Sequence, residues 1–203
     1  MIHVRGLHGN SFPSPSAYPE KAFILFRTRL GWMGLVGGEK GVQRIYLPEP
    51  SREDLRQRIG EEFPESREGS QFLEQAKKEI LEYFEGRRTQ FGMDLDLSSA
   101  TPFQRKVYQL MLAIPFGEVH TYRWLAEKIG NPKGLRAVGN ANGKNRWPLV
   151  VPCHRIVGSN GRLTGFSAPG GLDMKAELLR LEGVAVEEGK VKLNSECGMP
   201  NAE

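Results

Sequence analysis

The residues with the clearest chemical potential are Cys153 and His154, which are neighbours and follow Pro152 at the end of an apolar run. Thiolate is the nucleophilic form of cysteine, and at an ordinary pKa of about 8.5 only a few per cent is ionised at neutral pH. A reactive cysteine therefore requires a base or a cation nearby, and His154 and Arg155 are candidates. The alternative is that Cys153 is a packed small hydrophobic residue, which is the commoner role of a lone cysteine after an apolar run.

Adjacent residues on a strand point to opposite faces, so the spacing does not predict a direct contact between Cys153 and His154. Either the chain turns sharply after Pro152, or a water molecule connects the two side chains. A third group should orient the imidazole, and an acidic residue on the last helix, such as Glu182, is a candidate. The other cysteine, Cys197, lies in a polar tail and is interpreted as a bystander.

The composition is that of an ordinary globular protein, with 39% hydrophobic and 26% charged residues among 203. No apolar run approaches the roughly 20 residues of a membrane span, and the N-terminus lacks a secretion-signal pattern, so we expect a cytoplasmic protein. The two cysteines form no disulfide framework and no CxxC pair, and His3, His8 and His120 have no ligand-like spacing to them. We therefore expect no metal and no cofactor.

Charge is distributed unevenly along the chain. Residues 101–165 contain 10 Lys and Arg but only two acidic residues, Glu118 and Glu127. A basic block of this kind indicates a polyanion partner such as nucleic acid. The alternative is a solvated basic face.

Residues 1–19 are rich in Ser, Pro and Gly and are expected to form a loose tail. Residues 20–97 are expected to form a small α/β unit without catalytic groups. Its predicted elements are three strands separated by glycine turns, two helices and a last strand, at 22–28, 30–36, 42–48, 51–63, 70–86 and 89–97. The expected N-cap of the first helix is Ser51, and the expected buried face of the second is Phe72, Ala76, Ile80, Tyr83 and Phe84.

After a linker at 98–102, three short helices with tight turns are expected to begin at Thr101, Thr121 and Asn131. Three such helices, the third of them basic, predict a helix-turn-helix. We expect 148–158 and 162–167 to form a wing or strand pair. The last predicted elements are a closing helix at 170–183, with Leu172, Ala176 and Leu179 inward, and a C-terminal tail at 184–203.

The third helix has an unusual face. Arg136, Gly139, Asn140 and Gly143 recur at helical spacing, and each glycine inside a helix costs about 1 kcal/mol relative to alanine. One reason for two glycines is close approach of the backbone to a partner, such as a DNA minor groove that an Arg can enter. The alternative is a simple solvent face near a frayed helix end.

Several motifs in order resemble the O6-alkylguanine-DNA alkyltransferase family over residues 101–183. They are FGEVHTYRWLA, RAVGNAN, NRWPLVV, PCHRIV, GFSAPGGL and LLRLEG. The resemblance implies an α+β protein with a small, ribonuclease H-like N-terminal α/β domain at 20–97 and a C-terminal winged helix-turn-helix domain at 98–183. It also implies a monomer that repairs double-stranded DNA by flipping O6-alkylguanine and transferring the alkyl group irreversibly to a cysteine. One molecule of protein is then consumed for each group transferred.

The resemblance assigns the catalytic roles residue by residue. Cys153 accepts the alkyl group, and His154 deprotonates it through a water molecule. Glu182 orients the histidine, Tyr122 donates a proton to the departing guanine, and Asn145 ties the helix-turn-helix to the active-site loop.

The resemblance also implies residues for DNA and for the pocket. Arg136 fills the gap left by the flipped base. The other residues expected to contact DNA are Gly139, Asn140, Thr121 and Arg155, and those expected to form the substrate pocket are Ile156, Val157, Phe166 and Ser167. Phe166 stands where some members carry a tyrosine, so a hydroxyl contact is absent there.

Three other functions remain open from the sequence. A non-catalytic lesion-binding protein is disfavoured by Cys153, because such relatives replace the cysteine. A winged-helix transcription regulator has no need of the PCHR segment. A thiol hydrolase requires a separate His and Asn or Asp aligned on the thiol.

Overall fold

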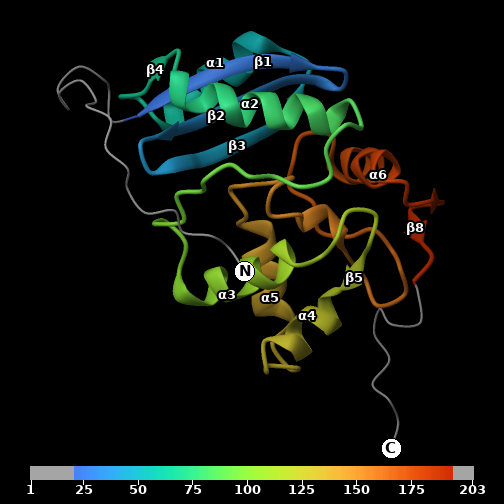
Figure 1. The fold of residues 1–203 in the computed structure, drawn as a ribbon. Coiled ribbons are helices and arrows are strands. Elements are labelled where there is room, and N and C mark those ends of the chain that lie inside the picture. The colour runs from blue at the N-terminus through green and yellow to red at the C-terminus, as the bar shows by residue number, and fades with distance from the viewer. Residues whose placement is uncertain (1–20, 194–203) are drawn as a thin grey trace, which may run out of the picture.

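The computed structural model describes residues 21–193, and its N-terminal half is built on the sheet coloured from blue to teal in Figure 1. Strands β1 (Ala22–Thr28), β2 (Gly31–Gly38) and β3 (Gly41–Glu49) form the predicted antiparallel meander. A short β4 (Arg67–Glu68) pairs in parallel with β1, which gives the order β3-β2-β1-β4. The expected α+β class is confirmed.

The sheet is covered on both faces because alternate residues of a strand point to opposite sides. Ile24 and Phe26 of β1 join the core with α2 (Gln71–Phe84), whereas Phe23 packs with α1 (Arg52–Glu62). The N-cap of α1 is Ser51, as predicted, and its hydroxyl accepts a hydrogen bond from the Asp54 amide at 3.1 Å.

Two predictions for the N-terminal half are wrong. Phe72 is 50% exposed, and its neighbour Leu73 is buried instead, whereas the other residues of the predicted face are buried as expected, namely Ala76, Ile80, Tyr83 and Phe84. Residues 89–97 form no regular strand. They run beside β3 with a single bridge between Val42 and Leu95, where Gly41, at φ +111°, lets the backbone of Asp94 approach closely.

Three helices pack together in the C-terminal half, as the elements coloured from green to gold-brown in Figure 1 show. They are α3 (Pro102–Leu112), α4 (Tyr122–Lys128) and α5 (Leu135–Gly143). The capping box of α3 is confirmed, with Thr101 and Gln104 bonding reciprocally. The predicted start of α5 at Asn131 is wrong, because Asn131 begins a turn closed by the Gly134 amide, and Gly134 is the N-cap.

The chain between α5 and the last helix differs from a simple strand pair. Residues Cys153–Arg155 form a 3-10 turn, η1, and β6 (Ile156–Val157) pairs in parallel with β5 (His120–Thr121). Helix α6 (Gly171–Leu181) follows, and then β7 (Val186–Glu187) and β8 (Lys190–Val191) form a hairpin.

Helix α6 and the segment after it require two corrections. Leu172 is 46% exposed rather than inward, and Lys175 and Leu178 are buried with the predicted Ala176 and Leu179. Residues 184–193, which the sequence assigned to a tail, form the β7–β8 hairpin, whose Val191 packs in a core cluster. The expected tail at 1–19 and the remaining residues 194–203, with Cys197, lie outside the described residues.

The two halves share one hydrophobic core, which includes Ile24 and Leu35 of the sheet and Val107 and Cys153 of the C-terminal half. Backbone and side-chain hydrogen bonds cross the junction. The Ile45 amide donates to the Arg146 carbonyl at 2.9 Å, and the Trp147 indole donates to the Val42 carbonyl at 2.7 Å. Across residues 21–193, no helix has the length and apolar character needed to cross a membrane.

Candidate active site

Cys153 lies at the start of a tight turn in the interior. The Cys153 amide donates to the Val151 carbonyl at 2.8 Å, and the Arg155 amide donates to the Pro152 carbonyl at 2.9 Å. Before this turn, Leu149 adopts a φ of +74°, a strained value for a non-glycine residue that its buried position maintains. The sharp turn after Pro152, one of the two expected ways of relating Cys153 to His154, is present in the structure.

The thiol of Cys153 is protonated at rest. Only 6% of the residue is exposed, and burial raises the pKa of the Cys153 thiol, with Asn145 and the Lys175 ammonium acting in the opposite direction. Asn145 also joins α5 to this loop, because its side-chain amide donates to the Val151 carbonyl at 2.7 Å and accepts from the Trp147 amide at 2.9 Å. A buried thiol of this kind requires a base before it can attack.

His154, the next residue in the turn, is the candidate for that base. The imidazole is fully buried, and its Nε2 lies 2.7 Å from Oε1 of Glu182. An ionised carboxylate only accepts hydrogen bonds, so Nε2 carries the proton and Nδ1 has a free lone pair. Among residues 21–193, Nδ1 has no hydrogen-bond partner. Burial lowers the pKa of His154 more than Glu182 raises it, so the imidazole is neutral at physiological pH.

Glu182 is the centre of a buried polar network. Arg155 donates to both of its oxygens, at 2.7 Å from Nε and 2.9 Å from Nη2, and donates from Nη1 to the Ile114 carbonyl at 2.6 Å. Burial alone raises the pKa of Glu182, but His154 and Arg155 lower it to about 2. The predicted pairing of Glu182 with His154 is therefore present in the structure.

The prediction that Arg155 contacts DNA is wrong. The residue was expected to contact DNA, but it is only 5% exposed and its guanidinium is used by Glu182 and Ile114. Thr121, also expected at the DNA, is buried, and its hydroxyl caps α4 by accepting from the Trp124 amide at 3.1 Å. Both residues therefore act inside the fold, where they hold the elements that carry the site.

Sequence reasoning missed Lys175. Its side chain is fully buried, and Nζ donates to the carbonyls of Ile156 at 2.6 Å and Thr164 at 2.7 Å. Desolvation lowers the pKa of Lys175 to about 8. The missed signal is that Lys175 precedes the buried Leu178 and Leu179 by three and four residues, which places a lysine on the apolar stripe of α6.

Tyr122 and Asn142 form a second polar pair beside the thiol. The Tyr122 hydroxyl accepts from the Asn142 amide at 3.1 Å and donates to the Gly165 carbonyl at 3.5 Å. Burial, ahead of the Cys153 charge, raises the pKa of Tyr122 to about 12, so the hydroxyl retains its proton at neutral pH. The sequence predicted Tyr122 but not Asn142, which lies on the buried side of α5.

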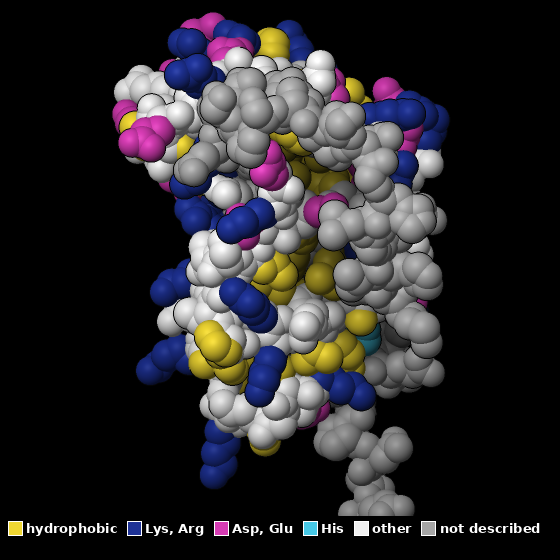
Figure 2. Space-filling model, turned by 60° about the vertical axis from the view of Figure 1, so that its left-hand side comes forward, with side chains coloured by type: hydrophobic (Ala, Val, Ile, Leu, Met, Phe, Trp, Pro, Cys, Tyr) yellow, Lys and Arg dark blue, Asp and Glu magenta, His cyan; other side chains and the backbone are white. Residues whose placement is uncertain are grey.

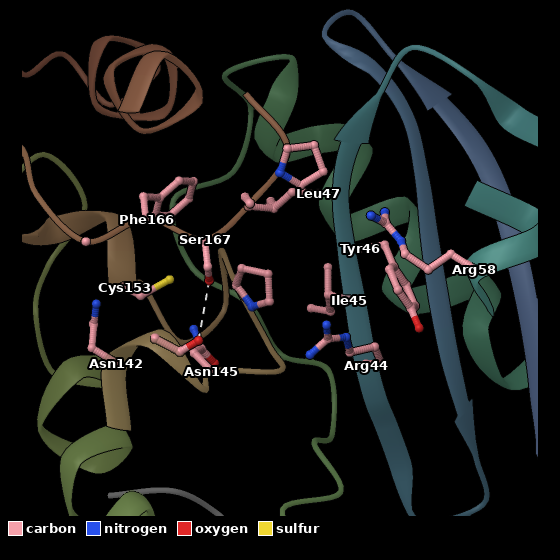
Figure 3. Close-up of a pocket in the computed structure, with 15 residues that line it drawn as sticks. Arg44, Ile45, Tyr46, Leu47, Arg58, Asn142, Asn145, Cys153, Phe166 and Ser167 are labelled. Atoms are coloured by element: carbon pink, nitrogen blue, oxygen red, sulfur yellow. Dashed lines mark hydrogen bonds between the residues drawn. The ribbon is translucent and has the colours of Figure 1, made fainter. Parts of the chain in front are cut away.

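Cys153 opens into a pocket of about 110 Å³ between the two halves. Figure 3 shows its sulfur directed toward the cavity, with Phe166 and Ser167 above it and Asn142 and Asn145 nearby. The opposite wall is the backbone and side chains of residues 44–47 on β3, with Arg58 of α1. The N-terminal half, where the sequence predicted no catalytic group, therefore supplies one wall of the cavity.

Only two of the four predicted pocket residues line the pocket. Phe166 and Ser167 line the pocket, and the Ser167 hydroxyl donates to the Gly143 carbonyl at 3.4 Å. Ile156 and Val157 do not line it. They are fully buried in β6, where they support the turn that carries Cys153.

A separate groove of about 500 Å³ runs along the exposed side of α5. Its lining includes Tyr122, Arg136, Gly139 and Gly165, and Gly165 also lines the pocket of Cys153. A side chain added at Gly139 meets nothing within 4 Å, so the glycine leaves the helix surface open. Asn140 is exposed on the same helix. The groove and the thiol pocket therefore meet at one loop.

Basic side chains surround this region. Figure 2 shows Lys and Arg outnumbering Asp and Glu over the lower half of the molecule, where α3, α4 and α5 lie. The arrangement is a basic, small-residue groove leading to a buried thiol with an adjacent base.

Comparison with known proteins gives a consistent result. The family model described as "6-O-methylguanine DNA methyltransferase, DNA binding domain" matches residues 102–184. The methylated-DNA–protein-cysteine methyltransferase of Methanosarcina acetivorans is 37% identical over 162 residues, which are 79% of this chain and 97% of the relative. The constitutive enzyme of that name from Bacillus subtilis is 37% identical over 161 residues, covering 79% and 94%.

Solved structures agree over the same length. The crystal structure of the Mycobacterium tuberculosis O6-methylguanine methyltransferase is similar with a TM-score of 0.67 and 33% identity, covering 80% of this chain and 92% of that one. The corresponding structure in complex with DNA has a TM-score of 0.66 and 33% identity, covering 79% and 92%. These two sequence relatives match at almost full length, and the fold is similar to that of the solved structures. The chain belongs to the methylated-DNA–protein-cysteine methyltransferase family.

Proposed function

We propose that this protein repairs alkylated DNA by direct reversal, transferring the alkyl group from O6 of guanine to the sulfur of Cys153. The observation that carries the proposal is that Cys153 and His154 follow one another in the same buried turn, η1. The imidazole has its Nε2 bonded to Glu182 and its Nδ1 free, as a base requires. The relatives that share this family are named for the same transfer to a protein cysteine.

The groove along α5 is the proposed DNA-binding surface. A guanine O6 inside a stacked duplex is out of reach of a buried thiol, so the base must rotate out, at a cost of a few kcal/mol. Arg136 is exposed on the groove, and small residues flank it at Gly139 and Asn140. These features favour insertion of Arg136 into the space that the base leaves, with the helix backbone close to the minor groove.

The chemical step follows from the protonation states. His154 Nδ1 takes the thiol proton through a bridging water, and the thiolate attacks the alkyl carbon of the flipped base. The new S–C bond forms as the C–O6 bond breaks, and the bonding electrons leave with the guanine. Tyr122, whose pKa is raised to about 12 and which is therefore protonated at neutral pH, donates to the departing guanine so that it leaves as a neutral base. The proton that His154 took from the thiol balances this transfer when it is passed back to Tyr122 through solvent.

The product explains why a single turnover is expected. A thioether has no acidic proton and is stable, and the part of the chain that the structure describes has no second thiol beside Cys153 to remove the alkyl group. We infer that each molecule accepts one alkyl group, acts as a monomer, and works in the cytoplasm on double-stranded DNA.

Mass spectrometry tests the proposal directly. The protein is mixed with duplex DNA containing O6-methylguanine and digested. We expect one added methyl group on the peptide that holds Cys153, none on the peptide that holds Cys197, and one equivalent of guanine restored. Cys153→Ser should bind the lesion without repair. Tight lesion binding by an unmodified wild-type protein would instead assign the chain to the lesion-recognition class.

A further inference from the structure

The N-terminal half reaches the catalytic network through one side chain. Tyr83 of α2 donates a hydrogen bond from its hydroxyl to Oε1 of Glu182 at 2.8 Å, although the two residues are 99 positions apart. Tyr83 is fully buried, and this carboxylate is the acceptor for its hydroxyl at the junction between the halves.

The oxygen that receives Tyr83 is the one that holds the histidine. Oε1 of Glu182 also contacts His154 Nε2 at 2.7 Å and Arg155 Nη2 at 2.9 Å. The other oxygen, Oε2, accepts from Arg155 Nε at 2.7 Å and from the Gly117 amide at 3.3 Å. The carboxylate is thus fixed by four residues from three segments of the chain, and among residues 21–193 Tyr83 is the one donor from the N-terminal half.

Aromatic packing determines where the Tyr83 hydroxyl points. The ring makes edge contacts with Phe84 and Phe116, at centroid distances of 5.4 and 6.1 Å, and a tilted contact with Phe91 at 5.4 Å. Burial, ahead of the Glu182 charge, raises the pKa of Tyr83, so the hydroxyl keeps its proton and donates. A ring held on three sides presents its hydroxyl in one direction.

We propose that Tyr83 is a positioning residue for alkyl transfer, which orients the Glu182 carboxylate on His154 and so couples the N-terminal half to the reaction. The inference rests on the proposed function of Cys153. It assigns to α2 a role in the rate of the chemical step, in addition to its packing against the sheet.

Loss of the Tyr83 hydroxyl should raise the pKa of His154. Without Tyr83, Oε1 is shared by two donors instead of three, so more of its negative charge faces the imidazole and the pKa of His154 rises. The other charged groups near the imidazole, Arg155 and Lys175, remain in place and act in the opposite direction. The acid limb of the pH–rate profile should move to higher pH, and a less rigid carboxylate should slow transfer by about 10-fold.

The chain provides a matched control. Tyr108 is also a buried tyrosine, and its hydroxyl donates to the Ala141 carbonyl at 3.1 Å, away from Glu182. Tyr83→Phe and Tyr108→Phe each remove one buried hydroxyl. The experiment measures the single-turnover rate of methyl transfer from an O6-methylguanine duplex between about pH 5 and 9, together with duplex affinity and melting temperature.

We expect Tyr83→Phe to be slower, with its acid limb raised and its DNA affinity unchanged, and Tyr108→Phe to keep the wild-type rate and profile. If both variants keep the wild-type rate and profile, the inference is wrong while the proposed function stands. A wild-type protein that transfers no methyl group overturns both.

A second substitution keeps the test valid if Tyr83→Phe does not fold. An ortho-fluorotyrosine at position 83 retains the hydroxyl and makes it a stronger donor to Oε1. The pKa of His154 should then fall, and the acid limb should move to lower pH than in the wild type. An unchanged acid limb with ortho-fluorotyrosine would also contradict the positioning role.

Discussion

His154 Nε2 and Glu182 Oε1 lie 2.7 Å apart in a part of the molecule where neither side chain is exposed. The two residues are 28 positions apart, at opposite ends of the segment that folds over the pocket. This contact fixes the tautomer of the imidazole and leaves Nδ1 as the acceptor. Because burial raises the pKa of the Cys153 thiol, the proposed mechanism requires this contact for activation of the thiol.

Replacing the carboxylate should therefore stop the chemistry. Glu182→Gln leaves Arg155 without its counter-charge and offers His154 an amide that can also donate, so the tautomer is no longer fixed. We expect the single-turnover rate to fall by at least about 100-fold, the size of a general-base contribution. The control is Glu177→Gln, which removes an exposed carboxylate of the same helix, paired with Arg180. Equal rates in both variants would remove Glu182 from the mechanism.

The same carboxylate predicts a loss of stability in acid. The pKa of Glu182 is about 2 in the folded protein against 4.5 for an ordinary glutamate. The unfolded chain therefore binds more protons within this window, and the stabilisation is complete above pH 4.5 and disappears as the pH falls toward 2. The shift corresponds to about 3 kcal/mol of unfolding free energy. Urea unfolding at several pH values should show this step in the wild type, and Glu182→Gln should lack it.

Arg136 should increase the rate of repair of duplex DNA but not the rate of reaction with a free base. The residue is exposed on the groove and does not belong to the buried network around Glu182. If it supports base flipping, Arg136→Ala should slow repair of an O6-methylguanine duplex by about 10- to 100-fold. Reaction with the free base O6-benzylguanine should be unchanged. An equal loss on both substrates would show that Arg136 acts on the chemistry or on the fold instead.

Binding to DNA should depend steeply on salt. The C-terminal half carries the basic block, and each phosphate contact should lower the logarithm of the association constant by about 0.9 per log unit of salt. Lys144→Ala, which removes an exposed cation at the end of α5, should reduce this slope by about one contact. Fluorescence anisotropy at several salt concentrations measures both slopes. A flat response in the wild type would contradict the polyanion partner.

Lys175 should hold the loop that closes the pocket. Lys175→Met keeps the length of the side chain but leaves the carbonyls of Ile156 and Thr164 without their donor. We expect faster amide hydrogen exchange in residues 164–167 and transfer slower by about 10-fold, because the pocket wall is less fixed. Lys128→Met on the exposed side of α4 is the control and should change neither.

The parts of the fold that depend on neighbours in sequence could be predicted. Caps at Ser51, Thr101 and Thr121 were correct because a cap is a contact between residues three positions apart. The resemblance supplied the partnership of His154 with Glu182. These features need no knowledge of how the two halves meet.

The parts that depend on packing between distant segments were missed or misplaced. Leu172 was assigned inward and Lys175 was overlooked, because only the neighbours of α6 decide which of its faces is buried. Arg155 was predicted to contact DNA because a basic residue is usually exposed, and its buried acceptor, Glu182, is 27 positions away in the sequence. The bond from Tyr83 to that same carboxylate spans the whole C-terminal half, and no local pattern signals it.

Cys153 belongs to the hydrophobic core that joins the two halves. An alkyl group on the sulfur occupies part of the pocket of about 110 Å³ into which Cys153 opens, and a group too large for that space forces the packed walls apart, which costs about 1 to 3 kcal/mol. That is a large share of the roughly 5 to 15 kcal/mol that keeps a domain folded. We therefore expect alkylation to lower the stability of the protein, and to lower it more as the transferred group becomes larger. Quality-control proteases can use this difference to remove spent molecules and leave competent ones in place.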